Sequence, residues 1–304
     1  MIELGIRNII ESYYRRKISF FSIFFFIFLS VFLLSKIVSD KYTSSSLLAY
    51  QNNLDSTQIN SLSQFSGLAS MAGIDLGDES ANRKQEVLAI MTSKDFLASF
   101  IDKYDLMPYI IAGNGWDMNT NSISYDNSIY RINDGSWVRK KKKYRNVVPS
   151  LFEGQEEFLK NNLRISENRK NGLINVSVIS HSPLLSRQIL LDLINHINSE
   201  IKSQDLEQSN KSIKFIDEQI EQTEIIELKD LFYRLKEEQL KKIMLAETKQ
   251  EYILKTVDKA YLPEKPSFPN RLFFYLSGLF LGFCISVLYI IFLAAKDKKI
   301  NGTS

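Results

Sequence analysis

Two long apolar runs without charged side chains lie near the two ends of the chain. One extends from Ile18 to Ser35 and the other from Leu272 to Ala295. An α-helix needs about 20 residues to cross a hydrocarbon core of roughly 30 Å, and lipid offers no partners for open backbone polar groups. The pattern therefore predicts two membrane-spanning helices, over residues 18–37 and 272–295.

The first run also has one feature of a cleavable secretory signal, because Arg15, Arg16 and Lys17 precede it. A signal has a shorter apolar core, of roughly 7 to 15 residues, and a cleavage site between small residues. The run is longer than that, and the sequence KIVSDKY after it contains no such site. We therefore favour a retained anchor over a cleaved signal.

Basic residues flank both runs on the sides that face the chain ends. Arginines and Lys17 precede the first run, and three lysines follow the second. Such residues are concentrated on the cytoplasmic side of a membrane. The expected topology therefore has cytoplasmic tails at residues 1–17 and 296–304, with an outer domain over residues 38–271.

The composition of the chain argues against several classes of function. The single cysteine, Cys284, lies inside the second apolar run, and there are two histidines, His181 and His196. Intramolecular disulfides and cysteine metal clusters are therefore not expected. The sequence also contains no phosphate-binding GxxxxGK[ST] loop. We expect no metal, no cofactor and no nucleic-acid partner. His181 lacks an accompanying catalytic set, and we interpret it as a turn residue.

The outer domain shows both strand and helix patterns. β-prone residues predict strands at Lys41–Gln51 and Glu251–Lys259, and clear alternation predicts a third at Gly172–Pro183. Helical spacing of apolar residues begins near Val87 and again after Ser93, a predicted N-cap. A glycine-rich segment, residues 67–80, is expected to be a loop.

Ser182 and Pro183 form a predicted N-cap and first-turn pair, and the stretch after them, without proline or glycine, predicts one long helix over residues 184–248. Its apolar residues recur every three or four positions, so the helix must bury a stripe against another element or another subunit. The adjacent Ile225 and Ile226 shift the phase, so a perfect coiled coil is not expected. We expect contacts between subunits at Ile213, Ile216, Ile220, Phe232 and Leu235.

Residues 109–150 form an insertion rich in Asn, Ser, Gly and Tyr, which predicts little regular structure. It carries a basic run made of Arg139, Lys140, Lys141, Lys142 and Lys143. We favour a solvated surface loop, which charge runs most often form. The alternative is a surface that contacts polyanionic glycan or phosphate headgroups.

Three prolines, Pro263, Pro266 and Pro269, lie within seven residues directly before the second apolar run. Each fixes φ near −65° and favours an extended residue before it, so the segment 263–269 is expected to be a stiff, non-helical strut. A simple helix stop would not need three. Within the run, Gly278, Gly282 and Ser286 form a small-residue face that allows close helix packing.

The order of these parts, ending in VDKAYLPEKPSFPNR, resembles the chain-length determinant (Wzz) family of bacterial polysaccharide co-polymerases. The family's most specific mark is a proline-rich segment next to the second membrane helix, on which Pro263, Pro266, Pro269 and Arg271 fall. The strand GLINVSVISHSP and the unit TSKDFLASFIDKYDL are supporting matches. The insertion at residues 109–150 departs from the family pattern.

The resemblance implies an α+β fold: two transmembrane helices flank a periplasmic domain with a membrane-proximal α/β base and a long projecting helix. It also implies a homo-oligomeric ring in the bacterial inner membrane that sets the length of lipopolysaccharide O-antigen or a related surface polysaccharide. Such a protein is not an enzyme. It works with a separate integral-membrane polymerase on a lipid-linked polysaccharide, in contact with membrane lipid.

Two other classes of function remain as alternatives. One is a membrane-anchored adaptor in polysaccharide export, which would leave polysaccharide length unchanged on deletion. The other is an enzyme acting on cell-wall sugar, which needs two carboxylates at a cleft. Many acidic residues lie on the predicted long helix as solvated charge, and the sequence shows no catalytic set of residues, so we set the enzyme aside.

Overall fold

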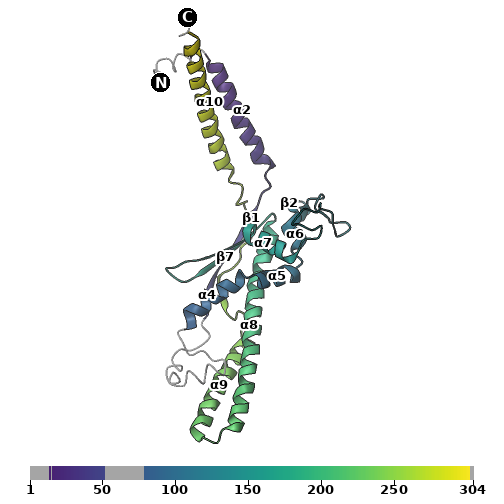
Figure 1. The fold of residues 1–304 in the computed structure, drawn as a ribbon, viewed down its shortest axis with the longest axis vertical. Coiled ribbons are helices and arrows are strands. Elements are labelled where there is room, and N and C mark those ends of the chain that lie inside the picture. Colours follow the sequence, from purple (N-terminus) through teal and green to yellow (C-terminus); the bar gives the residue numbers. More distant parts are fainter. Residues whose placement is uncertain (1–13, 15, 52–78, 302–304) are drawn as a thin grey trace. The chain divides into compact units, whose positions relative to one another are not determined.

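The computed structural model describes residue 14 and residues 16–51 and 79–301 (Figure 1). The chain divides into two compact units. The helical unit comprises residues 1–41 and 265–304, and the α/β unit comprises residues 42–264. In the predicted glycine-rich loop, residues 67–78 lie outside the described residues, whereas Glu79 and Ser80 are helical and not part of a loop.

The helical unit contains two apolar helices, α2 (Lys17–Ile37) and α10 (Arg271–Asn301), which pack against each other. Ring contacts join them, with Phe32 stacked on Tyr275 at a centroid distance of 5.5 Å. Both helices are long and apolar enough to cross a membrane. The prediction of two such helices at the ends of the chain is confirmed.

A four-stranded antiparallel sheet forms the base of the α/β unit. Its strand order is β6 (Leu163–Glu167), β7 (Ile174–Ser180), β1 (Tyr42–Tyr50) and β8 (Leu254–Asp258). β1 is therefore an inner strand, paired with β7 on one side and with β8 on the other. The three strands predicted from the sequence are β1, β7 and β8.

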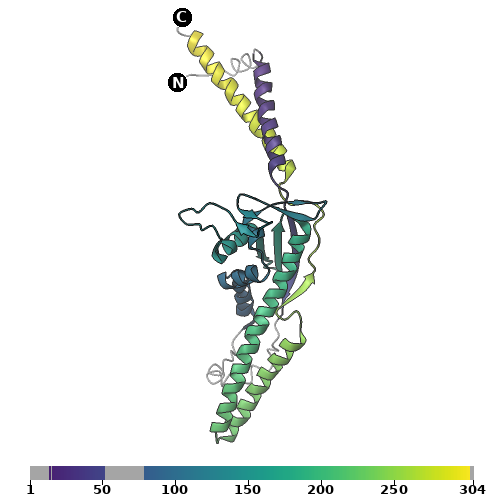
Figure 2. The same cartoon turned by 90° about the vertical axis from the view of Figure 1, so that its right-hand side faces the viewer.

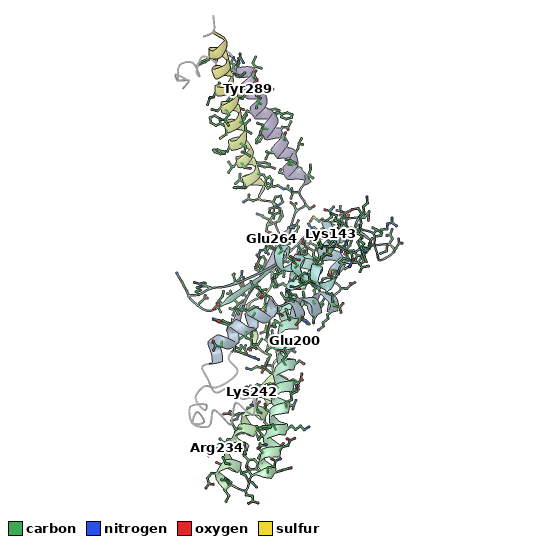
Figure 3. The ribbon with its side chains drawn as sticks, in the orientation of Figure 1. Lys143, Glu200, Arg234, Lys242, Glu264 and Tyr289 are labelled. Atoms are coloured by element: carbon green, nitrogen blue, oxygen red, sulfur yellow. The ribbon has the colours of Figure 1, made fainter. Side chains whose placement is uncertain are left out.

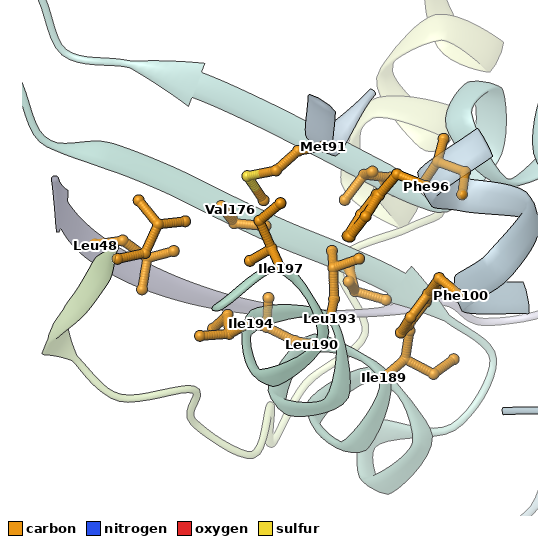
Figure 4. Packing of buried hydrophobic residues seen from close by; sticks show 14 of the residues in the cluster. Leu48, Met91, Phe96, Phe100, Val176, Ile189, Leu190, Leu193, Ile194 and Ile197 are labelled. Carbon is orange, nitrogen blue, oxygen red and sulfur yellow. The ribbon is translucent and has the colours of Figure 1, made fainter. Parts of the chain in front are cut away.

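Helices pack on the sheet and enclose one large core. These are α4 (Glu79–Met91), α5 (Lys94–Lys103), α6 (Met107–Ala112), α7 (Leu151–Asn161) and the first part of α8 (Pro183–Gln222). Leu48 and Val176 from the sheet meet Met91, Phe100 and Leu193 from the helices (Figure 4). Caps start the helices as predicted, because Ser93 and Ser182 accept hydrogen bonds from the first-turn amides of α5 and α8.

A buried amide attaches the edge strand β8 to α8. Asn198 donates to the carbonyl of Leu254 and accepts hydrogen bonds from the amides of Ile253 and Leu254, at 2.8 to 3.1 Å. A buried polar side chain costs stability unless its partners are supplied. Here both the amide nitrogen and the amide oxygen of Asn198 have partners, so this side chain sets the position of β8 along α8.

The insertion is more regular than its composition predicts. It forms two two-stranded sheets, β2 (Gly113–Asp117) with β3 (Ser122–Tyr125) and β4 (Tyr130–Arg131) with β5 (Ser136–Trp137). The Tyr130 ring contacts Trp137 at 4.9 Å and Tyr125 at 5.8 Å. Such aromatic pairs stabilise short strands. The content of Asn, Ser and Gly does not predict these strands, because it gives no information on which rings come into contact.

The predicted continuous helix over residues 184–248 is wrong in one respect. α8 ends at Gln222, and α9 (Ile226–Thr248) runs back beside it as a helical hairpin (Figures 1 and 2). Thr223 and Ile225 have extended backbone angles between the two helices. A single helix would leave its apolar stripe in water, whereas the hairpin buries the stripe against itself, and this gain outweighs the few backbone hydrogen bonds lost at the turn.

Candidate functional site

The proline-rich segment is joined by backbone hydrogen bonds to the residue that precedes β1. The Lys41 amide donates to the Phe268 carbonyl at 2.8 Å, and the Ser267 amide donates to the Lys41 carbonyl at 2.8 Å. Pro266 and Pro269 lie on either side of this pairing, and Pro263 lies four residues before Ser267. The segment is not helical, as predicted. The chain is therefore tied to itself where α2 ends and where α10 begins.

An ion pair closes the same junction. Arg271, at the start of α10, donates through Nη2 to both carboxylate oxygens of Asp40 at 2.9 Å. Both side chains are partly exposed, so the pair alone contributes modestly to stability. The pair holds the end of α2 close to the start of α10, although these two helix ends are far apart in the sequence. We predicted Arg271 but missed Asp40, the acidic residue that follows the first apolar run.

The small-residue face of α10 lies against α2 of the same chain. A Cβ atom added at Gly278 would lie 3.1 Å from the side chain of Val31, and one added at Gly282 would lie 3.2 Å from Phe24. Ser286, on the same face, is fully buried. Small residues here permit close contact between the two helices. The structure thus gives this face a partner within one chain.

The apolar stripe of the long helical segment also has its partner within the chain. Ile216, on α8, forms a buried cluster with Leu231, Phe232 and Leu235 of α9, and Ile220 packs against it. Ile213 is half-buried. This arrangement differs from the predicted contacts between subunits, because the returning helix covers the stripe.

A second apolar stripe lies on the opposite, exposed side of α9. Its members are spaced by seven, seven and four residues, which places them on one face of a helix. Their exposed fractions are 79%, 57%, 50% and 58% for Ile226, Tyr233, Leu240 and Met244. Sequence analysis missed this stripe, although its spacing is visible in the sequence, because a single continuous helix offered no way to tell an inner face from an outer one.

Arg139 differs from the lysines that follow it. Its guanidinium donates to both oxygens of Glu153, and its Nε donates to the carbonyls of Asn146 and Val147. Its side chain is 11% exposed. Arg139 therefore holds residues 139–147 as a closed loop. The side chains that are free to meet a ligand are those of the exposed residues Lys140, Lys141, Lys142 and Lys143.

A cleft of about 440 Å³ opens beside this segment. Its charged lining consists of Arg139, Lys140, Lys142, Arg145, Glu153 and Glu157. Four cationic groups face two carboxylates there, and one of these, Glu153, is already paired with Arg139. The cleft is thus suited to an anionic group.

The two histidines occupy structural positions. His181 donates its backbone amide to the Tyr109 hydroxyl at 3.2 Å. His196 lies among the rings of Phe96, Phe100 and Tyr104, with Nε2 3.1 Å from Ser99 Oγ. Burial lowers the pKa of His196, and the charge of Lys103 lowers it further. Within the described ranges, no group of three or more His, Cys, Asp or Glu side chains is placed to hold a metal.

Known structures with a similar course of the chain carry the following names. One is a full-length bacterial polysaccharide co-polymerase, with 10% sequence identity, 98% of each chain covered and a TM-score of 0.44. Another is a fragment of WzzB, a polysaccharide co-polymerase from Salmonella Typhimurium, with 14% identity, 76% of this chain and 100% of the fragment covered, and a TM-score of 0.30. No family profile and no curated protein sequence matches the chain.

Proposed function

We propose that this protein regulates the chain length of a bacterial surface polysaccharide, such as lipopolysaccharide O-antigen. It acts without catalysing a reaction, as a homo-oligomeric co-polymerase of the inner membrane beside a separate polymerase and its lipid-linked product. The observation that carries the proposal is the junction at which the proline-rich segment pairs with Lys41 and Arg271 pairs with Asp40. The residues that carry the sequence resemblance lie at this junction.

The junction supports the proposal through mechanics. A regulator of polymer length must hold its outer domain steadily while a long product grows beside it. Prolines restrict the backbone of the connection, and the Asp40–Arg271 pair and the backbone bonds of Lys41 join the two helix ends. Bending of the connection is thereby opposed at two points rather than one.

The membrane topology is part of the proposal. α2 and α10 are the two spans, both termini are cytoplasmic, and the α/β unit lies in the periplasm. A reporter fused after Ser304 is expected to be active only in the cytoplasm, and one inserted near Asn121 only in the periplasm. A periplasmic C-terminal fusion would contradict the two-span topology.

Self-association is supported by the exposed stripe of α9, defined by Ile226, Tyr233, Leu240 and Met244. Apolar residues at seven-residue spacing are typical of a seam between helices. We assign this seam to a second copy of the chain, because the hairpin presents it outward while its inner face is already filled. Several hairpins packed in this way build a ring.

The test compares surface polysaccharide from cells with and without the protein. Loss of the protein is expected to change the distribution of chain lengths on a gel, and the wild-type gene should restore it. An unchanged distribution with less polysaccharide at the surface would instead indicate an export adaptor. Neither result depends on knowing which sugar is polymerised.

A further inference from the structure

The insertion lies at the end of the α/β unit where the chain enters and leaves that unit. Tyr42, the first residue of the unit, packs edge-on against Trp116 of β2 at 5.7 Å. Figure 3 shows Lys143 and Glu264, the last residue of the unit, toward the same end, whereas Arg234 of α9 lies toward the other. The basic segment thus belongs to the end that is connected to both apolar helices.

The connection at this end is short. Four residues, 38–41, separate the end of α2 at Ile37 from the start of β1 at Tyr42. A chain of this length reaches no more than about 18 Å between the two flanking Cα atoms. If α2 spans the membrane, the end of the unit that carries Tyr42 and Trp116 is therefore close to the lipid headgroups.

The basic loop, residues 139–148, presents positive charge that is not neutralised within the described residues. Lys140, Lys141, Lys142 and Lys143 are exposed, and their ammonium groups make no ion pair in the described part of the chain. Arg145 is only loosely paired, with Nε 3.6 Å from a Glu153 oxygen that Arg139 already holds. Lys140, Lys142 and Arg145 also line the cleft of about 440 Å³, which has room for a phosphate group.

Exposed apolar side chains stand beside these charges. The Tyr144 side chain is 88% exposed and Val148 62% exposed, and Phe152 in the first turn of α7 is also exposed. A basic surface interleaved with exposed aromatic and aliphatic side chains is typical of segments that lie at a membrane surface. A soluble polyanion would satisfy the lysines but would leave these apolar groups in water.

We propose that the basic loop docks onto a bilayer surface that contains anionic phospholipid. Lipid phosphates bind Lys140, Lys142 and Arg145 in the cleft, while Tyr144 and Val148 enter the headgroup region. The Arg139–Glu153 pair holds the loop in the shape that brings these groups together. The inference rests on the membrane anchorage in the proposed function and is independent of chain-length control.

The test uses the full chain reconstituted in lipid nanodiscs. In a Cys284→Ser background, Asn146→Cys carries an environment-sensitive fluorophore within the loop. Quenching by lipids that bear a nitroxide near the headgroup reports contact with the bilayer. Discs of phosphatidylcholine alone are compared with discs that also contain phosphatidylglycerol. A label on Glu224→Cys, in the hairpin turn, is the matched negative position.

Quenching at residue 146 is expected in the phosphatidylglycerol discs and not in phosphatidylcholine discs or at residue 224. Each lysine removed should lower the docked-to-undocked ratio about fivefold. The variant with Lys140, Lys141, Lys142 and Lys143 all changed to Gln should abolish quenching. In the control variant, Lys211, Lys214, Lys229 and Lys241 of the hairpin are changed to Gln. It loses the same amount of charge but should keep the quenching.

Three outcomes would overturn the proposal. These are equal quenching in both kinds of disc, no quenching at residue 146 in either, and loss of the signal in the hairpin control. If an added polyanionic sugar shifts the fluorescence while lipid does not quench it, the ligand is carbohydrate and the proposal is wrong. A label on the native Cys284 of α10 tests anchorage separately. In discs whose lipid carries the nitroxide on the acyl chain, this label must be quenched at both lipid compositions if α10 is inserted.

Discussion

The guanidinium of Arg139 donates one hydrogen bond to each carboxylate oxygen of Glu153, at 2.5 and 2.6 Å. These bonds lower the pKa of Glu153 and outweigh the opposing effect of its partial burial. Two further bonds from Arg139 Nε reach the carbonyls of Asn146 and Val147. One side chain thus joins both ends of the basic loop to the first turn of α7.

Changing Arg139 to Ala is expected to open the basic loop without unfolding the α/β unit. The paired charges are partly buried, and a lost charge-assisted hydrogen bond costs about 1.5 to 3 kcal/mol locally. Limited trypsin digestion should then cut after the exposed lysines at residues 140–143 at least several times faster. Arg139→Lys is the matched control, which keeps the charge but loses the paired geometry, so intermediate protection is expected. Unchanged cleavage in the Ala variant would show that the pair does not hold the loop.

The stability of the α/β unit should depend on pH through His196. Burial among rings lowers its pKa below the ordinary value, so the unfolded chain binds the proton more readily than the folded one. The contribution of neutral His196 to the free energy of unfolding is fully present above about pH 6.5, the ordinary pKa of histidine. It is lost as the pH drops from there toward the lower pKa of the folded state. Thermal melting between pH 8 and 5 should show this loss in the wild type. In His196→Phe the loss over this window should be smaller, and an identical pH dependence would exclude His196 as its source.

The two faces of the hairpin should respond differently to a buried charge. Ile216→Asp places a carboxylate in the filled inner cluster and should melt the hairpin, which circular dichroism records as lost helix content. Tyr233→Asp with Leu240→Asp alters the outer stripe and should leave helix content unchanged while reducing oligomer size by light scattering in detergent. An unchanged oligomer in a protein with normal helix content would argue that subunits meet elsewhere.

Close contact between α2 and α10 should depend on Gly278 and Gly282. Leucine at both positions places side chains where Val31 and Phe24 now lie, so the helices must separate. Spin labels on the two helices should report a longer distance, and the distribution of polysaccharide lengths should broaden or shorten. Phe280→Leu, on an exposed part of α10, is the control that should change neither. Unaltered helix spacing would show that the pair tolerates bulk.

The proline segment should matter for function more than for folding. Changing Pro263, Pro266 and Pro269 to Ala restores conformational freedom to the connection while leaving the sheet and the hairpin intact. We expect normal abundance in the membrane with an altered length distribution on a gel. Asp40→Asn, which weakens the pair with Arg271, should act in the same direction but more mildly. Normal banding in both variants would remove the reason for placing function at this junction.

Local patterns were sufficient for much of this protein. The lengths of the two apolar runs predict α2 and α10, alternation predicts β7, and Ser182 with Pro183 predicts the start of α8. Each of these depends on residues close together in the chain, through helix caps, side-chain period or the thickness of a membrane. For that reason these elements can be predicted from a single sequence.

Contacts between distant residues required the tertiary structure. No local signal breaks the helix at Thr223, because the hairpin is favoured by burial of Ile216 against Phe232, residues that meet only after the turn forms. The partners of Arg271 and Arg139 likewise come from elsewhere in the sequence, Asp40 from the residues after α2 and Glu153 from α7. The sequence alone determined the two apolar helices, the strands β1, β7 and β8 and the start of α8. Folding decided where the long helix turns back, which charges are already paired and which lysines remain for a ligand, since these depend on distances in space rather than on spacing along the chain.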